Sequence, residues 1–270
     1  TAPILAAVGV IGKTAIGFKS FKQNAKQAFT VMLGSAEAAQ QHLDRILAFA
    51  KTTPFAFPDL VSANRVMVAF GINAEKTFSI LDAIGNAVAA MGGGATEIEQ
   101  MADIFGKIQA YGKVTAQELN RFSAMGINAY AILANQAGIS MDQLRERVSK
   151  GAIGSEVAIS QLVDGIMYGT KGVAGTTVAL GGSLAALKKT WSGVMDSLKA
   201  TWRNTADAII SEQVFEKLIA GARKLIEMLK SVQHAAEAFG KLPVSIQLAA
   251  WGLLLFVAAI GPALLSYQRT

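Results

Sequence analysis

The chain has 270 residues, with 25 lysines and arginines against 19 aspartates and glutamates, so its formal net charge is +6. Charged residues make up 16 % of the chain, against about 25 % in an average soluble domain, and 52 % are hydrophobic, which excludes an intrinsically disordered chain. The lack of cysteine excludes a disulfide scaffold, a thiolate metal site and a cysteine nucleophile, and two histidines, His42 and His234, are too few for a histidine-rich zinc site. Because the chain begins with Thr1, we expect it to be a piece of a longer protein.

The first segment, residues 1–33, is basic and apolar, and we expect it to be helical. Four lysines and no acidic residue fall within residues 1–36, and the lysines are spaced among apolar residues. Nucleic-acid binders usually gather basic residues along one stripe with aromatic partners, so this pattern disfavours DNA or RNA binding. An anionic membrane surface, an acidic protein wall and a merely solvated face all remain open.

Residues 34–168 read as a domain of short helices, because apolar residues recur every three or four positions and sustained alternation is absent. The fold class predicted is therefore all-α, with no sheet. The expected helices cover 36–51, 59–70, 74–91, 97–111, 116–125, 129–137, 141–149 and 156–168.

Capping signals support these boundaries. A hydroxyl residue followed three positions later by Glu or Gln predicts a capping box at Thr96, Thr115 and Ser140. Glycines follow the apolar stretches, where a helix often ends on a residue with positive φ. These glycines are Gly71, Gly92, Gly112, Gly126 and Gly138.

Two loops break the helical pattern. Prolines at positions 54 and 58 forbid a continuous helix, and the aromatic Phe55 and Phe57 between them predict a packed corner. Residues 169–182 hold five glycines and few large side chains, so we expect a flexible connector that ends the domain.

Residues 183–241 carry a heptad pattern, which predicts long coiled-coil-like helices. The flanking positions are uncharged, which favours three or more helices over a two-stranded zipper, although a helix packed in a single-chain bundle remains open. The predicted seam consists of Phe215, Leu218, Ala222, Leu225, Leu229, Val232, Ala236 and Phe239.

The last segment, residues 242–270, contains a run from Ile246 to Leu265 without a formal charge. Such a run is long enough to cross a bilayer as a helix of about 30 Å, although a buried helix in an assembly is an equal alternative. The residues that mark this candidate membrane segment are Trp251, Leu254, Phe256 and Ile260.

Two motifs imitate enzyme sites. Residues 7–14 fit a relaxed phosphate-loop pattern, and residues 181–185 resemble a degraded nucleophile elbow, but neither follows a predicted strand. The sequence therefore predicts no catalytic, cofactor-binding or metal-binding residue, and no enzyme. Only a substantial β-sheet in the structure would support the interpretation of this chain as a nucleotide-binding protein.

Two blocks of the sequence resemble the tape measure domain of long-tailed bacteriophages. The first runs from Gly34 to Gly71, and the second contains the run QAYGKVTAQEL followed by MGI; together the resemblance covers about residues 30–200. The residues carried over as family motif or packing positions are Thr53, Pro54, Phe55, Asp59, Phe70, Gly71, Gly112, Lys113 and Gly126.

This resemblance implies a structural protein that lies in the lumen of the phage tail, sets tail length during assembly and leaves ahead of the DNA, which follows it as cargo. It implies as partners the protein's own copies, with a trimer favoured, the tail tube and tail tip proteins, and the host inner membrane. A pore-forming or membrane-disrupting helical protein is the alternative. Because one helix of 270 residues would reach only about 400 Å, we expect the long measuring coiled coil to lie outside this chain.

Overall fold

The computed structural model describes residues 2–190, 211–241, 244 and 246, with the backbone alone for residues 2–15 and parts of the last helix. The chain divides into two compact units, residues 1–210 and 211–270. The first unit contains α1 (Ala2–Leu33), α2 (Ala36–Thr52), α3 (Phe57–Ala69), α4 (Lys76–Met91), α5 (Ala95–Ala110), α6 (Ala116–Ala124), α7 (Ala129–Gln136), α8 (Met141–Ser149), α9 (Ser155–Tyr168), β1 (Thr170–Gly172), β2 (Gly175–Thr177) and α10 (Ser183–Leu187).

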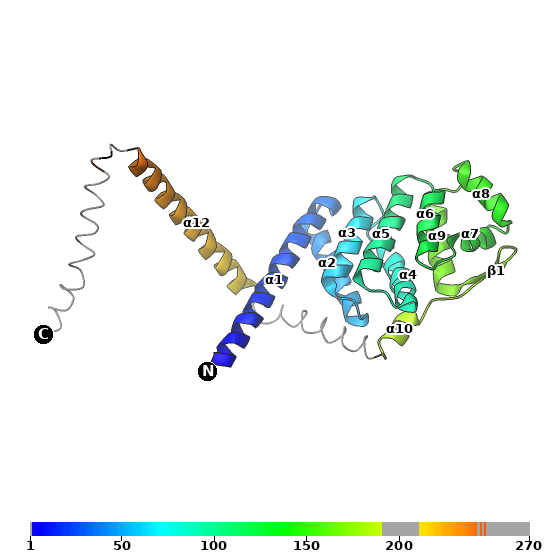
Figure 1. Cartoon of the computed structure of the whole chain (residues 1–270), viewed down its shortest axis with the longest axis horizontal. Helices are drawn as coiled ribbons and strands as arrows, with labels where there is room; N and C mark the ends of the chain where they lie inside the picture. The colour runs from blue at the N-terminus through cyan, green and yellow to red at the C-terminus, as the bar shows by residue number, and fades with distance from the viewer. Residues whose placement is uncertain (1, 191–210, 242–243, 245, 247–270) are drawn as a thin grey trace. The chain divides into compact units, whose positions relative to one another are not determined.

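The helices of the first unit pack in a bundle whose main interfaces join α1 with α2, α3 with α5, and α7 with α9. Figure 1 shows α1 and α2 at one end of this domain and α7, α8 and the β1–β2 hairpin at the other. The largest fully buried side chains include Phe29, Phe57, Phe105 and Phe122. Phe105 of α5 and Phe122 of α6 meet edge to face at 5.2 Å between ring centroids, a favoured aromatic geometry.

The predicted helices of residues 34–168 are confirmed, and no boundary differs by more than two residues. Ser140 forms the predicted capping box with Gln143, and its hydroxyl accepts the Gln143 backbone N–H at 3.3 Å. The glycines at the helix ends have positive φ, from 64° at Gly138 to 89° at Gly71, which an L side chain rarely adopts.

Two capping predictions are wrong in detail. The helix expected to start after Thr96 begins at Ala95, and the Glu97 carboxylate accepts the Gly94 backbone N–H at 2.7 Å. At the next start the Thr115 hydroxyl donates to the buried Glu118 carboxylate instead of accepting a backbone N–H. Glu97, at the third helical position, thus caps the start of α5, whereas Glu118 bonds the Thr115 hydroxyl and, among the described residues, no backbone N–H.

The prediction of no sheet is also wrong. Within the expected connector, β1 and β2 form an antiparallel hairpin in which Thr170 pairs with Thr177 and Gly172 with Gly175. The hairpin is small, and its order comes from hydrogen bonds to α7 that no local pattern reveals.

Residues 7–14 lie inside α1, so they form a helix and not a phosphate-binding loop.

The second unit is described through α12 (Glu212–Gly240). Of the predicted seam, Phe215 is buried, whereas Ala222 and Leu225 are exposed, and the other five seam side chains lie outside the described set. The coiled coil therefore stays a prediction.

The candidate membrane segment lies outside the described residues; its marker residues are Trp251, Leu254, Phe256 and Ile260. None of the helices in the described part combines the length and apolarity that a membrane crossing requires.

Candidate functional site: a cleft between α4 and α9

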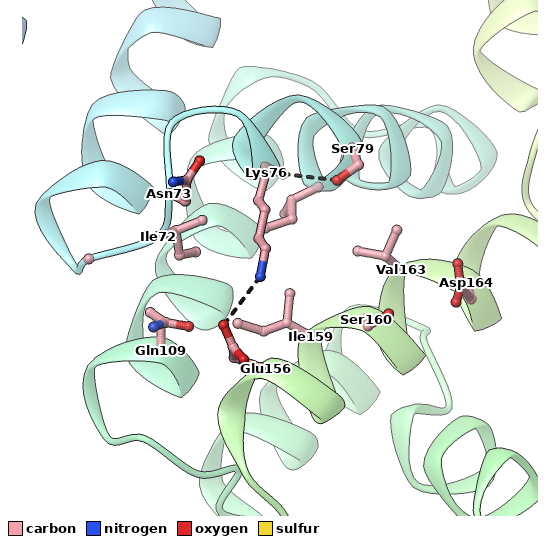
Figure 2. Close-up of a pocket in the computed structure, with 12 residues that line it drawn as sticks. Ile72, Asn73, Lys76, Ser79, Gln109, Glu156, Ile159, Ser160, Val163 and Asp164 are labelled. Atoms are coloured by element: carbon pink, nitrogen blue, oxygen red, sulfur yellow. Dashed lines mark hydrogen bonds and ion pairs between the residues drawn. The ribbon is translucent and has the colours of Figure 1, made fainter. Parts of the chain in front are cut away.

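A cleft of about 340 Å³ opens between α4 and α9 and is bounded further by α5 and the α3–α4 turn. Figure 2 shows the side chains of Ile72 and Ile159 pointing toward its interior. The lining residues are Gly71, Ile72, Asn73, Lys76, Ser79, Ile80, Gln109, Glu156, Ile159, Ser160, Val163 and Asp164. The cleft thus combines an apolar floor with a polar rim.

The α3–α4 turn builds one wall. Gly71 ends α3 with a φ of 89°, and the Ile72 backbone N–H returns to the Met67 carbonyl at 3.1 Å, which turns Ile72 inward. The Asn73 side chain then accepts the Glu75 N–H at 2.8 Å and holds the turn that starts α4. The predicted motif residue Gly71 therefore positions a floor residue of the cleft.

An ion pair bridges the mouth of the cleft. Lys76 Nζ at the start of α4 lies 3.2 Å from Glu156 Oε1 of α9, as the dashed line in Figure 2 marks. Both side chains are exposed, by 64 % and 77 %, and an ion pair this open to water contributes between about 0 and 1 kcal/mol. An incoming group can therefore separate the two charges at little cost.

The second sequence block fixes the α9 wall. The backbone at Lys113 bridges to Gly154, the Val114 N–H donates to the Ile153 carbonyl at 3.1 Å, and the Ser155 N–H donates to the Gly112 carbonyl at 3.0 Å. These bonds tie the start of α9 to the loop after α5. The carried-over residues Gly112 and Lys113 thus act on the cleft through the position of α9, without lining it.

The other predicted site residues lie away from the cleft. Thr53 and Phe55 are buried in the corner after α2, next to Pro54, and Asp59 lies in the first turn of α3. Phe70 packs against Gly106 of α5, where a Cβ would stand 2.4 Å from its ring. Gly126 has a φ of 80° and lies against the Met91 thioether.

A buried polar pair connects α2 and α3 outside the cleft. His42 Nε2 donates to Asn64 Oδ1 at 2.7 Å, and the imidazole contacts the rings of Phe29 and Phe78 edge to face. Burial lowers the pKa of His42 from its ordinary value of 6.5, and the Arg45 guanidinium lowers it further, while the hydrogen bond to Asn64 opposes them. Burial therefore favours the neutral imidazole in spite of the hydrogen bond to Asn64, and the pair acts within the core.

Sequence reasoning missed Lys76 and Glu156, which are 80 residues apart and belong to no common motif. Across the described part of the chain, no three His, Asp or Glu side chains lie close enough together to hold a metal ion. The cleft offers an apolar floor, a polar rim and an exposed ion pair that contributes little stability.

Comparison with known proteins gives a consistent result. The model of the tape measure protein family matches residues 17–200, which is more than half of the chain. The Mu-like prophage FluMu protein gp42 of Haemophilus influenzae is 25 % identical over 251 residues, covering 84 % of this chain but only 38 % of that protein. No solved structure matches. The chain therefore belongs to the tape measure protein family.

Proposed function

We propose that this chain is part of a phage tail tape measure protein that fills the lumen of the tail tube and sets tail length during assembly. The family match over residues 17–200 carries this proposal, and the Mu-like prophage relative supports it. The role is structural and not enzymatic, because tape measure proteins act by occupying space. The protein would reside in the virion and leave the tail ahead of the DNA.

The folded domain is unsuited to be the ruler itself. Helices α1–α9 turn back on one another around a shared core, so adding residues to this part does not add length along one axis. A ruler needs a rise of 1.5 Å for every helical residue, which only an extended helix provides. We therefore assign the domain to placement and assembly. We assign the measurement of tail length to helical segments outside this domain, since the chain covers only 38 % of the length of its Mu-like prophage relative.

The cleft is the surface through which the domain would contact a tail tube or tail tip protein. A charge in its floor removes the apolar contact, so Ile159→Asp should reduce tail assembly, whereas Ser160→Asp on the rim should leave it unchanged. Electron microscopy of particles from a phage that carries each variant measures assembly. Equal tail yields for the two variants would remove the cleft from the function.

Measuring tail length distinguishes a domain that acts in placement and assembly from a domain that itself measures the tail. Internal deletions within residues 60–120 should block assembly, because they remove parts of α3, α4 and α5 from the core. The tails that do form should have the normal length. Tails that shorten in proportion to the residues removed, with assembly intact, would contradict our assignment of the domain.

Self-association through α12 is the expected way in which copies meet. Leu225, Ile226 and Met228 are exposed by more than half on this helix. Packing against partner helices would remove this apolar surface from water. Sedimentation equilibrium of the chain should give the mass of a trimer, and Leu225→Asp should reduce it, while Lys230→Asp on the polar side should not. A monomeric wild-type chain would end the trimer proposal.

A membrane role is the second candidate, favoured by the uncharged run of residues 246–265 and the basic residues 13–26. In that role the released protein would open the host inner membrane. Vesicles of anionic lipid loaded with a dye should leak when the chain is added, and a variant lacking residues 242–268 should cause no leakage. Vesicles that stay sealed with both proteins would exclude this role.

A further inference from the structure

The segment that leaves the domain after α9 is attached to it at three separate places. We call residues 170–187 the strap; they include the β1–β2 hairpin and α10. In Figure 1 the strap runs from the hairpin beside α7 to α10 beside α4. The strap ends three residues before the last residue, Thr190, that the structure describes in the first unit.

The first attachment is a single side chain of α7. Asn135 Nδ2 donates to Thr170 Oγ1 at 3.0 Å and to the Gly175 carbonyl at 2.9 Å, while its Oδ1 accepts the Ala174 N–H at 2.9 Å. One amide thus contacts both strands and the turn between them. Gly172 packs directly on it, and a Cβ there would stand 2.7 Å from Asn135 Oδ1.

The second attachment joins the strap to the end of α9. The Leu180 N–H donates to the Ile166 carbonyl at 2.9 Å, and the Gly181 N–H donates to the Met167 carbonyl at 3.0 Å. A Cβ at Gly181 would stand 2.7 Å from the same Met167 oxygen, so only glycine lets the backbone lie this close. These bonds satisfy two carbonyls in the last turn of α9.

The third attachment holds α10 against α4. Asn86 Nδ2 donates to the Asp82 carbonyl at 2.9 Å, which aims Oδ1 at the Leu184 N–H, 3.1 Å away. The Leu184 side chain lies in the space left by Gly85, next to the Phe55 ring, and is 9 % exposed. The corner residue Phe55 thus forms part of the seat for α10.

Little apolar surface supports these hydrogen bonds. Leu184 is the buried large side chain of the strap, Ala174 and Leu180 are partly buried against the core, and Val173 and Val178 are exposed by 74 % and 76 %. The domain helices, in contrast, bury continuous apolar faces, and α1 alone buries Phe18 and Phe29. Hydrogen bonds contribute far less net stability than such a core, so the strap should open at a lower free energy than the domain.

We infer that the strap is a latch that fixes where the chain leaves the domain and opens before the domain unfolds. Under tension from the C-terminal side it detaches in order: α10 leaves α4, then Leu180 and Gly181 leave α9, and the hairpin leaves Asn135 last. Opening adds about 60 Å of extended chain between the domain and the segment that follows. The inference does not depend on the tape measure function.

Hydrogen exchange of the full chain tests the latch. The amides of Ala174, Leu180 and Leu184 should exchange at least tenfold faster than those of α3 and α5, with little dependence on added denaturant. Asn135→Ala should accelerate the strap amides about tenfold more and leave α3 and α5 unchanged, and the neighbouring Gln136→Ala should accelerate neither. Strap amides that exchange in step with α3 and α5 in the wild type would overturn the inference.

A second pair of variants tests the α10 seat without touching α7. Leu184→Ser should accelerate exchange of the strap, whereas Leu187→Ser, on a half-exposed position of the same helix, should not. Faster exchange throughout α3 and α5 in Leu184→Ser would mean that α10 belongs to the domain core, and the latch would be refuted.

Mechanical stretching measures the order of opening. The chain has no cysteine, so Gln41→Cys on α2 and Thr190→Cys after α10, both exposed, provide two unique attachment points for an optical trap. The force–extension curve should show a first step that increases the contour length by about 60 Å, and the domain should unfold at a later step. Asn135→Ala should lower the force of the first step alone. A single step for the whole domain would contradict the latch.

Discussion

The crossing of α7 and α9 offers a sharp test of the packing described above. Gly165 lies inside α9, and a Cβ at this position would stand 2.2 Å from Ile132 Cγ2 and 3.1 Å from Ile132 Cβ. Ile132 is buried and branched at Cβ, so it can neither leave the interface nor rotate freely. Gly165→Ala should therefore destabilise the domain.

Two opposing contributions set the magnitude. Alanine favours a helix interior over glycine by about 1 kcal/mol, whereas overpacking a dense interface costs about 1–3 kcal/mol. Because the clash falls on a buried, branched side chain, the cost should lie at the upper end of that range, and the net loss should be about 2 kcal/mol. Gly17→Ala is the matched control, since its Cβ would meet no atom within 4 Å, and it should stabilise α1 by up to about 1 kcal/mol.

Urea unfolding followed by circular dichroism at 222 nm measures both variants. Ile132→Ala should cost about 2–5 kcal/mol by itself, and combining it with Gly165→Ala should cost less than the sum by about 1 kcal/mol or more, because the methyl group added on α9 then occupies the space vacated on α7. If Gly165→Ala and Gly17→Ala change the unfolding midpoint in the same direction by the same amount, the steric reasoning is wrong.

Three further predictions concern charge and capping. The lowered pKa of His42 means that the folded state favours the neutral imidazole, so the urea midpoint should fall as the pH drops below 6.5, and His42→Gln should lose that dependence. Asp103→Asn breaks ion pairs of 2.8 and 2.9 Å with two cationic partners and should cost about 1 kcal/mol, a difference that 0.5 M salt reduces. Ser140→Ala removes the hydroxyl that caps α8 and should cost about 1 kcal/mol, whereas Ser149→Ala at the other end should change stability by less than about 0.5 kcal/mol. Thermal melts that rank the two serine variants equally would contradict the capping argument.

The helices of residues 34–168 could be located from the sequence because their signals are local. Ser140 and Gln143 are three residues apart, and a helix-ending glycine such as Gly71 directly follows the apolar stretch that it closes. The cleft and the strap could not be located, because their contacts are long-range. Lys76 meets Glu156 across 80 residues, and Asn135 orders a loop that starts 35 residues later.

The glycines explain why the sequence predicts a flexible connector over residues 169–182, where the structure has the β1–β2 hairpin. Sequence reasoning treats a glycine as the end of a helix or as a sign of flexibility, but several glycines of this domain mark close contacts. Leu184, Phe70 and Ile132 each occupy the space that a Cβ would fill at Gly85, Gly106 and Gly165 inside a neighbouring helix.

The same explanation covers the strap. Gly172 and Gly181 lie against an amide and a carbonyl, where any side chain would push the strap away from α7 and α9. A glycine-rich segment is then ordered when its neighbours provide hydrogen-bond partners at that distance, and mobile when they do not. Asn135 is such a partner, so its identity, more than the glycine content of residues 169–182, decides whether this segment is a connector or a latch.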